Sequence, residues 1–288
     1  MRIKSIKKKF NIPWKLKSII FSFIDYLNAP RLLYFLQKYI TKRSRIDSLV
    51  VSPYWQLHKK TLKNYNTTEV IFEFGAGKTL VQNLYLSNFV KKQLVVDLYP
   101  MIDLDSVEFI RKKLMEITKL RSKVKIKNIK DLEYYGIHYK APYDATKSHL
   151  SEKSIDACIS TNTLEHIPEP DIIAIFFELH KILKDEGIIS AIIDYSDHYA
   201  HTDKRISLLN YLRFTTYQWS RYNHSIHYQN RLRHYEYINI FKKTGFTVIK
   251  ERLVFAEKNI PSEILDSYKN HNPTWKATSA HIILKKTK

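Results

Sequence analysis

Short apolar runs alternate with longer amphipathic stretches from Glu69 to the end of the chain. The apolar runs have the length of buried strands and lie at residues 70–74, 94–96, 124–126, 155–160, 188–193, 247–250 and 281–284. Helical periodicity fills most of the intervals, at residues 80–89, 105–118, 170–183 and 235–243. Because near-continuous apolar strands are buried on both faces, this alternation predicts an α/β fold with a parallel sheet between two helical layers.

Residues 1–68 depart from this alternation as a basic, aromatic and helical extension. The first 45 residues hold twelve lysines and arginines but one acid, Asp25. Their apolar run at 19–24 is too short to span a bilayer, and no small-residue cleavage site follows it. The extension is therefore either an interfacial helix on an anionic membrane or a helical cap on the main domain, which we place at residues 69–288.

A second departure lies at residues 194–234, directly after the predicted fifth strand. This insertion holds five of the twelve arginines of the chain, interleaved with aromatic residues. Guanidinium groups bind phosphate or carboxylate through paired hydrogen bonds, and aromatic faces stack on sugar rings. We expect the insertion to cap a substrate pocket, and the residues expected to bind an anionic substrate are Arg205, Arg213, Trp219, Arg231 and Arg233.

The formal net charge of +20 raises the question of a nucleic-acid partner. Most of the basic residues are lysines spread along the chain, and only 5 residues are glycine, as an AT-rich coding sequence would produce. Nucleic acid is therefore disfavoured. Cys158 is the only cysteine, which excludes an internal disulfide or a cysteine-rich zinc cluster and favours a reducing compartment such as the cytoplasm.

A glycine-rich turn follows the first predicted strand. The run Glu73-Phe74-Gly75-Ala76-Gly77 ends that strand, and a helix is expected directly after it. Glycines let the backbone turn sharply and approach a ligand that lies across the strand ends. Asp97 follows Gly77 by twenty residues, at the end of the second predicted strand, where a carboxylate can accept hydrogen bonds from both ribose hydroxyls. The pattern predicts a nucleoside cofactor.

Further motifs narrow the choice of cofactor. Leu80 stands where a dinucleotide fold needs a third glycine or alanine, so NAD is disfavoured. The runs Tyr143-Asp144-Ala145 and Leu164-Glu165-His166-Ile167-Pro168 lie before and after the predicted fourth strand. With these motifs, residues 69–284 resemble class I S-adenosylmethionine-dependent methyltransferases of the small-molecule branch. The resemblance implies a Rossmann-like, doubly wound and mostly parallel seven-stranded sheet with an antiparallel last strand, and S-adenosylmethionine as cofactor.

The resemblance also implies which residues hold this cofactor. In such enzymes the glycine-rich turn cradles the amino-acid part, the acid matched by Asp97 holds the ribose, and the acid matched by Asp144 lies near the adenine amine. The implied cofactor-binding set is Glu73, Gly75, Ala76, Gly77, Asp97, Leu98, Asp144, Ala145, Thr161 and Asn162. Lys78 and Thr79 are a departure, because many members have another glycine there.

Methyl transfer to a hydroxyl needs a group that removes the proton of the acceptor. The segment after the fifth predicted strand, residues 194–203, holds two histidines and three aspartates. We expect His198 to be the general base, with His201 second and His166 third, and either Asp194 or Asp197 to orient the imidazole. Asp197, His198, His201 and Asp203 could also hold a metal, but methylation of a sugar hydroxyl does not require one, and none is expected.

The insertion supplies the expectation for the acceptor. Its runs at 210–214 and 230–233, with Trp219, are similar to bacterial methyltransferases associated with surface-polysaccharide synthesis. The expected activity is O-methylation of a saccharide or phosphorylated glycan intermediate by a cytoplasmic enzyme, held at the inner membrane face if the extension binds lipid. The alternatives are an RNA or lipid-quinone methyltransferase and a non-catalytic, membrane-associated scaffold with this fold.

Overall fold

A seven-stranded sheet organises the chain in the computed structural model, which describes residues 12–27, 52–255 and 260–287. The strands are β1 (Val70–Phe74), β2 (Lys92–Val96), β3 (Ile137–Lys140), β4 (Ile155–Thr161), β5 (Leu183–Asp194), β6 (Phe246–Phe255) and β7 (Ala277–Lys286). They lie in the order β3-β2-β1-β4-β5-β7-β6, and β7 is antiparallel to both of its neighbours. The expected Rossmann-like, mostly parallel sheet with an antiparallel last strand is confirmed.

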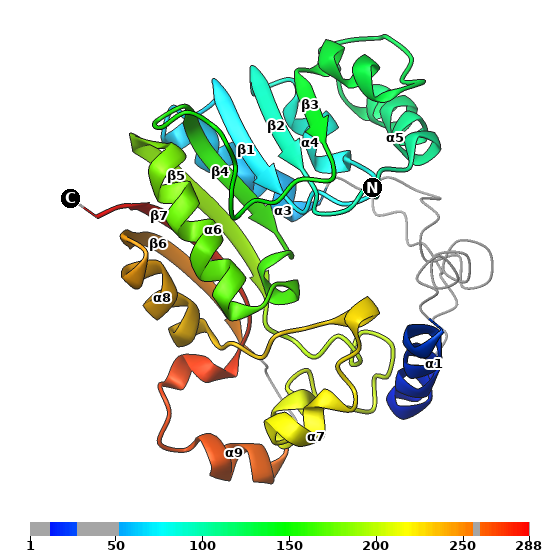
Figure 1. The fold of residues 1–288 in the computed structure, drawn as a ribbon, viewed down its shortest axis with the longest axis vertical. Helices are drawn as coiled ribbons and strands as arrows, with labels where there is room; N and C mark the ends of the chain where they lie inside the picture. Colours follow the sequence, from blue (N-terminus) through cyan, green and yellow to red (C-terminus); the bar gives the residue numbers. More distant parts are fainter. Residues whose placement is uncertain (1–11, 28–51, 256–259, 288) are drawn as a thin grey trace.

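Helices cover both faces of this sheet, as the apolar strands require. The helices of the described residues are α1 (Trp14–Tyr26), α3 (Pro53–Asn64), α4 (Val81–Leu86), α5 (Leu104–Ile117), α6 (Glu169–Ile182), α7 (Thr216–Ser220), α8 (His234–Lys243) and α9 (Ser262–Tyr268). Buried side chains of α6 and α8 pack on one face, and those of α3, α4 and α5 pack on the other. Figure 1 shows α6 and α8 in front of the sheet, with α3 and α4 behind it.

One predicted strand was wrong. Residues 124–126 are not a strand, and the third strand is β3 at Ile137–Lys140. The Ile126 amide donates instead to the Glu108 carboxylate at 3.0 Å, and the Val124 carbonyl accepts from the Tyr135 hydroxyl at 2.6 Å. Side-chain hydrogen bonds therefore satisfy the backbone of residues 124–126. The edge strand of the sheet is β3, which follows the 3₁₀ helix η2 (Ile129–Tyr135).

The insertion between β5 and α8 forms a cap with its own apolar core. It contains the 3₁₀ helices η4 (Asn210–Arg213) and η5 (Ser225–His227) and the short helix α7. Trp14 and Phe21 of α1 pack into this core with Tyr199 and Trp219, and Figure 1 shows α1 beside the cap. The described part of the extension is thus not a separate unit, since α1 docks on the cap and α3 packs on the sheet.

Candidate active site

The glycine-rich turn leaves the carboxyl end of β1 and has the backbone that its sequence predicts. Gly75 and Gly77 have φ angles of +71° and +74°, a region that other residues rarely adopt. A Cβ atom on Gly75 would collide with Thr163, whereas a Cβ on Gly77 would meet nothing within 4 Å. The turn therefore packs tightly against the segment after β4 and leaves open space in front of Gly77, which we call the cradle.

Asp97 follows the last residue of β2 and lies beside this cradle. Its carboxylate is buried, and it accepts the Gly77 N–H at 3.3 Å and the Tyr139 hydroxyl at 3.1 Å. Burial raises the pKa of Asp97 to about 6, and these two hydrogen bonds offset part of the rise. Around neutral pH the carboxylate is ionised and can accept hydrogen bonds from a ribose, so the turn and the acid fit the expected cofactor.

Glu73 lies one strand position below the turn and is held inside the fold. Its two carboxylate oxygens accept from the side-chain amides of Gln82 at 2.9 Å and Asn83 at 2.6 Å. Burial raises its pKa to about 8, the two amide donors oppose the rise, and the Asp97 carboxylate adds to it. Glu73 thus joins the end of β1 to α4 and positions the turn.

The other predicted cofactor residues gather around the same edge of the sheet. The Tyr143 amide donates to the Asp97 carbonyl at 2.9 Å, which brings Asp144 and Ala145 next to the end of β2. Asn162 is exposed with φ +49°, and the neighbouring Thr163 hydroxyl donates to the Gly75 carbonyl at 3.2 Å.

Three of the predicted side chains have placements that limit their roles. The Thr161 hydroxyl lies 2.9 Å from His58 Nε2 and 3.1 Å from the Gln82 amide oxygen, so it is engaged within the fold. Leu98 is exposed next to Asp97, and the Asp144 carboxylate accepts from Thr146.

A histidine cluster lies where the cap meets the carboxyl ends of β4 and β5. The His198 ring centre lies 4.9 Å from that of His166, 5.0 Å from that of His201 and 6.0 Å from that of His227. All three predicted bases therefore lie together, although they come from two segments of the chain. His227, from η5, was missed because a lone histidine in the cap carries no spacing signal.

Asp194 is the carboxylate of this cluster. Its Oδ2 atom lies 3.4 Å from His201 Nε2 and 3.7 Å from His198 Nε2. The Asp197 carboxylate is instead buried and accepts from the Tyr199 amide at 2.8 Å and the Asn210 side chain at 3.0 Å. Of the two acids that the sequence left open, only Asp194 is placed to orient an imidazole.

Glu165 is a second carboxylate at the cluster, and the sequence prediction did not single it out. It lies in the 3₁₀ helix η3 (Leu164–His166) directly after β4, and it is 1% exposed. Neither carboxylate oxygen has a hydrogen-bond partner among the described residues. Only its burial distinguishes it, and burial at a single polar position is not visible in a sequence.

Most of the residues that the sequence predicted to bind an anionic acceptor make their contacts inside the cap. The prediction that Arg233 binds the acceptor is corrected. The Arg233 guanidinium is buried and donates to the carbonyl groups of Trp275, Tyr195 and Ala277 and to the Tyr211 hydroxyl. The Arg231 guanidinium likewise donates to two carbonyl groups and a hydroxyl of the cap. Trp219 is buried in the apolar core of the cap.

Two of the predicted arginines remain at the surface. Arg205 pairs with Asp203 at 2.8 Å, and Arg213 pairs with Glu263 at 3.3 Å. The Asp203 carboxylate also accepts the Trp14 amide at 2.9 Å, which fixes the first turn of α1 on the cap.

Helix α1 reaches the histidine cluster from the other side. Its Phe21 ring lies 4.8 Å from the His227 ring, and the Lys17 ammonium lies 5.0 Å from the Tyr199 ring. Burial lowers the pKa of His198 to about 3, and the His166 and His201 imidazoles and the Lys17 charge add to this effect. His198 is therefore neutral across the physiological pH range.

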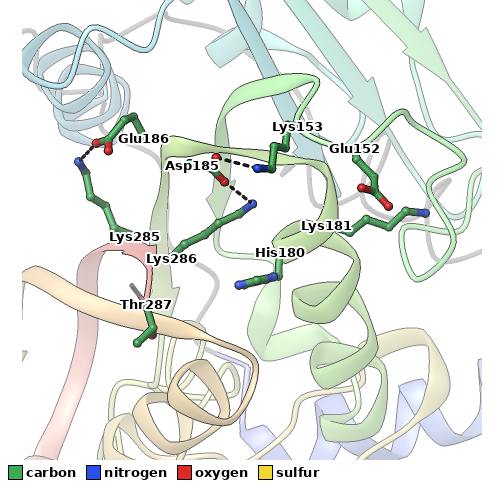
Figure 2. A pocket seen from close by; sticks show the side chains of 9 residues that line it. All are labelled: Glu152, Lys153, His180, Lys181, Asp185, Glu186, Lys285, Lys286 and Thr287. Atoms are coloured by element: carbon green, nitrogen blue, oxygen red, sulfur yellow. Dashed lines mark hydrogen bonds and ion pairs between the residues drawn. The ribbon is translucent and has the colours of Figure 1, made fainter.

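A hollow of about 620 Å³ lies at the opposite end of the parallel strands, where β5 begins and β7 ends. Figure 2 shows Asp185 between Lys153 and Lys286, with Glu186 bound to Lys285. These charges are paired with one another at the surface, and the hollow is remote from the strand ends that carry the candidate cofactor and histidine residues. We therefore assign no chemistry to it.

Residues 110–191 match a family model described as a methyltransferase domain. Among solved structures, the chain is similar to 1,6-didemethyltoxoflavin-N1-methyltransferase of Burkholderia thailandensis, whose structure holds bound 1,6-didemethyltoxoflavin and S-adenosylhomocysteine. The two are 12% identical with a TM-score of 0.51, over 91% of this chain and 90% of that one. This similarity shows a shared fold.

Two further solved structures are similar at lower scores. The YcgJ protein of Bacillus subtilis is 15% identical with a TM-score of 0.45, over 82% of this chain and 98% of that one. A methyltransferase of Methanosarcina mazei is 16% identical with a TM-score of 0.45, over 83% and 99%. No curated protein sequence matches the chain.

The sheet order, the glycine cradle beside a buried acid and the matched domain together define the class of the protein. It is an S-adenosylmethionine-dependent methyltransferase with a Rossmann-like fold, and S-adenosylmethionine is its cofactor.

Proposed function

We propose that this enzyme transfers the methyl group of S-adenosylmethionine to a hydroxyl of a saccharide or phosphorylated glycan intermediate. The observation that supports hydroxyl chemistry most is the pair formed by Asp194 and His201, at 3.4 Å, at the end of β5. The Thr163–Gly75 hydrogen bond joins the glycine-rich turn to the segment after β4, and His166 of that segment lies against His198, so the cofactor residues adjoin the histidine cluster. A hydroxyl needs such a base, whereas a thiol or amine needs it less.

His201 is the residue that we assign as general base. Ser196 donates its hydroxyl hydrogen to Asp194 Oδ1 at 2.6 Å, so Ser196 Oγ accepts from His201 Nε2 at 2.9 Å. This arrangement, with Asp194 Oδ2 nearby, places the imidazole hydrogen on Nε2. The lone pair is then on Nδ1, which is the atom that takes the proton of the acceptor.

This assignment reverses the order expected from sequence, where His198 came first. The pKa of His198 is lowered to about 3, mainly by burial, and an imidazole of such low basicity is a poor general base at neutral pH. When bound, S-adenosylmethionine supplies an electrophilic methyl group, which the acceptor oxygen takes as the carbon–sulfur bond breaks. The chain supplies alignment and the proton acceptor.

The saccharide assignment is supported by the exposed imidazole rings of His166 and His201, which offer flat faces, with that of His201 close to the Asp194 carboxylate. An anionic acceptor has less support than the sequence suggested, since Arg231 and Arg233 bind the cap itself. Of the arginines that the sequence predicted to bind the acceptor, Arg205 and Arg213 lie at the surface, and these two are the candidates for a phosphate.

The general base is tested with His201→Asn and Asp194→Asn, using His271→Asn as a matched control at an exposed site. Methyl transfer from labelled S-adenosylmethionine is measured over a panel of nucleotide sugars, oligosaccharides, RNA and quinones. We expect both cluster variants to lower turnover on a saccharide by about a hundredfold, while S-adenosylhomocysteine binding and the control are unchanged. Wild-type turnover in His201→Asn would remove it from this role.

The panel also separates the alternative functions. Methylation of RNA or a quinone in preference to every saccharide would replace the proposed acceptor. Cofactor binding without methylation of any acceptor would favour the scaffold.

We further propose that the enzyme contacts an anionic membrane through α1. No helix in the described part of the chain is both long and apolar enough to cross a bilayer. The inner face of α1 packs against the cap. Its outer face and the residue that follows the helix present six exposed apolar side chains: Leu16, Ile19, Ile20, Phe23, Tyr26 and Leu27. The surrounding 45-residue segment is strongly basic, which complements anionic lipid.

A further inference from the structure

The starting point is the unpartnered carboxylate of Glu165. It is 1% exposed, and among the described residues neither oxygen has a hydrogen-bond partner. A buried carboxylate without a partner is costly, so the position suits a cation or another ligand with a hydrogen-bond donor.

Two imidazoles lie where they could share such a ligand. One ligand atom each from Glu165, His166 and His198 all lie within 4.8 Å of one another. His166 Nδ1 lies 2.8 Å from the Tyr228 carbonyl oxygen, which can only accept, so Nδ1 carries the hydrogen and Nε2 the lone pair. A backbone carbonyl on the far nitrogen is the usual support of a metal-binding histidine.

We propose that Glu165, His166 and His198 bind one divalent transition-metal ion of the zinc type at the acceptor side of the active site. Two neutral imidazoles and a carboxylate suit zinc or cobalt, whereas magnesium and calcium prefer oxygen ligands throughout. Ligand atoms around zinc lie about 3.3 Å apart, so binding draws the three side chains together by small rotations.

The role of this ion rests on the proposed function. Three protein ligands leave a coordination position open, as in catalytic rather than structural zinc sites. An acceptor hydroxyl at that position would lose its proton more readily, and His201, whose ring centre lies 5.0 Å from that of His198, would receive it. In this arrangement His198 binds the ion and His201 accepts the proton.

The test measures metal binding directly, without activity. The untagged full chain is treated with a chelator, dialysed, and titrated with Zn²⁺ by calorimetry and with Co²⁺ by visible absorption. We expect one ion per chain, an affinity at least tenfold weaker in Glu165→Gln and His198→Ala, and no change in His271→Ala. Mg²⁺ should give no comparable binding. Retained S-adenosylhomocysteine binding shows that each variant is folded.

Either of two results would overturn the metal site: no Zn²⁺ or Co²⁺ binding by the wild-type chain, or equal affinity in the two cluster variants. In the first case, Glu165 would remain as a group for direct contact with the acceptor. The outcome is independent of the proposed function, since a hundredfold loss of turnover in His201→Asn without any metal binding would keep the methyl transfer and discard the ion.

Discussion

At the scale of single residues, burial decides what each carboxylate of the site can do. Three buried carboxylates lie at or just beyond the carboxyl ends of strands: Glu73 in β1, Asp97 after β2 and Glu165 after β4. Their hydrogen-bond partners differ. Asp97 keeps a backbone amide and a hydroxyl, Glu73 has two side-chain amides, and Glu165 has none among the described residues. Asp97 is therefore suited to binding a ribose, Glu73 to holding β1 against α4, and Glu165 to binding a cation.

Glu73 gives a prediction at this scale. Its pKa is raised from 4.5 to about 8, so the folded chain binds a proton there more tightly than the unfolded chain. Between these two values the unfolded state therefore holds fewer protons, and the contribution of Glu73 to stability falls as the pH rises. Glu73→Gln should abolish this fall, which is on the order of a few kcal/mol between pH 5 and pH 8.

Urea unfolding of the two proteins across this pH range measures the effect, because the difference in unfolding free energy between variant and wild type should grow with pH. A difference that does not change with pH would mean that Glu73 is not a buried acid of raised pKa. Comparing slopes removes any constant loss from altered hydrogen bonds to Gln82 and Asn83.

At the scale of elements, α1 joins the cap to the molecular surface. Its inner face contributes the Trp14 amide to Asp203, Ser18 to His224 and Asp25 to Ser225, so the helix is fixed at both ends. Its outer side chains Ile19 and Phe23 are 65% and 61% exposed. The sequence left a docking helix and a membrane helix as alternatives, and the two faces of α1 allow both roles together.

A flotation assay tests the outer face. The wild-type protein should float with phosphatidylcholine vesicles that contain phosphatidylserine, and much less with phosphatidylcholine alone. Ile19→Asp with Phe23→Asp should weaken binding at least tenfold, because two apolar side chains no longer enter the interface. Met115→Asp with Ile117→Asp, at exposed positions of α5, is the matched control.

Equal flotation of the α1 variant and the control would exclude the outer face as the contact. Failure of the wild-type chain to float would remove the membrane altogether. Dimerisation that the α1 variant abolishes would instead assign this face to a second copy of the chain.

At the scale of the whole molecule, much of the framework could be predicted from the sequence. Apolar runs identified β1 and β4 closely, and the glycine spacing identified the turn between Gly75 and Gly77. Residues 124–126 misled because side chains can satisfy a backbone that has the composition of a strand. A local sequence pattern indicates local structure. It does not show which of two short apolar runs joins the sheet as its edge strand.

The acceptor end could be predicted only in part. Two neighbouring histidines after a strand indicated a base, but the approach of His166 and His227 depends on tertiary packing. Arg233 was expected at the substrate because a guanidinium in a cap binds anions, yet it is buried among backbone carbonyls. A sequence does not distinguish a charge that binds substrate from one that holds a loop.

Binding of S-adenosylhomocysteine measured by calorimetry tests the account most directly, because the whole interpretation depends on the cradle between Gly77 and Asp97. Wild-type protein should bind one molecule per chain. Asp97→Ala, which removes the ribose acceptor, and Gly77→Leu, which fills the open cradle and strains a positive φ, should each weaken binding at least tenfold. Unchanged affinity in both variants, or no binding by the wild-type chain, would contradict the assignment of this site.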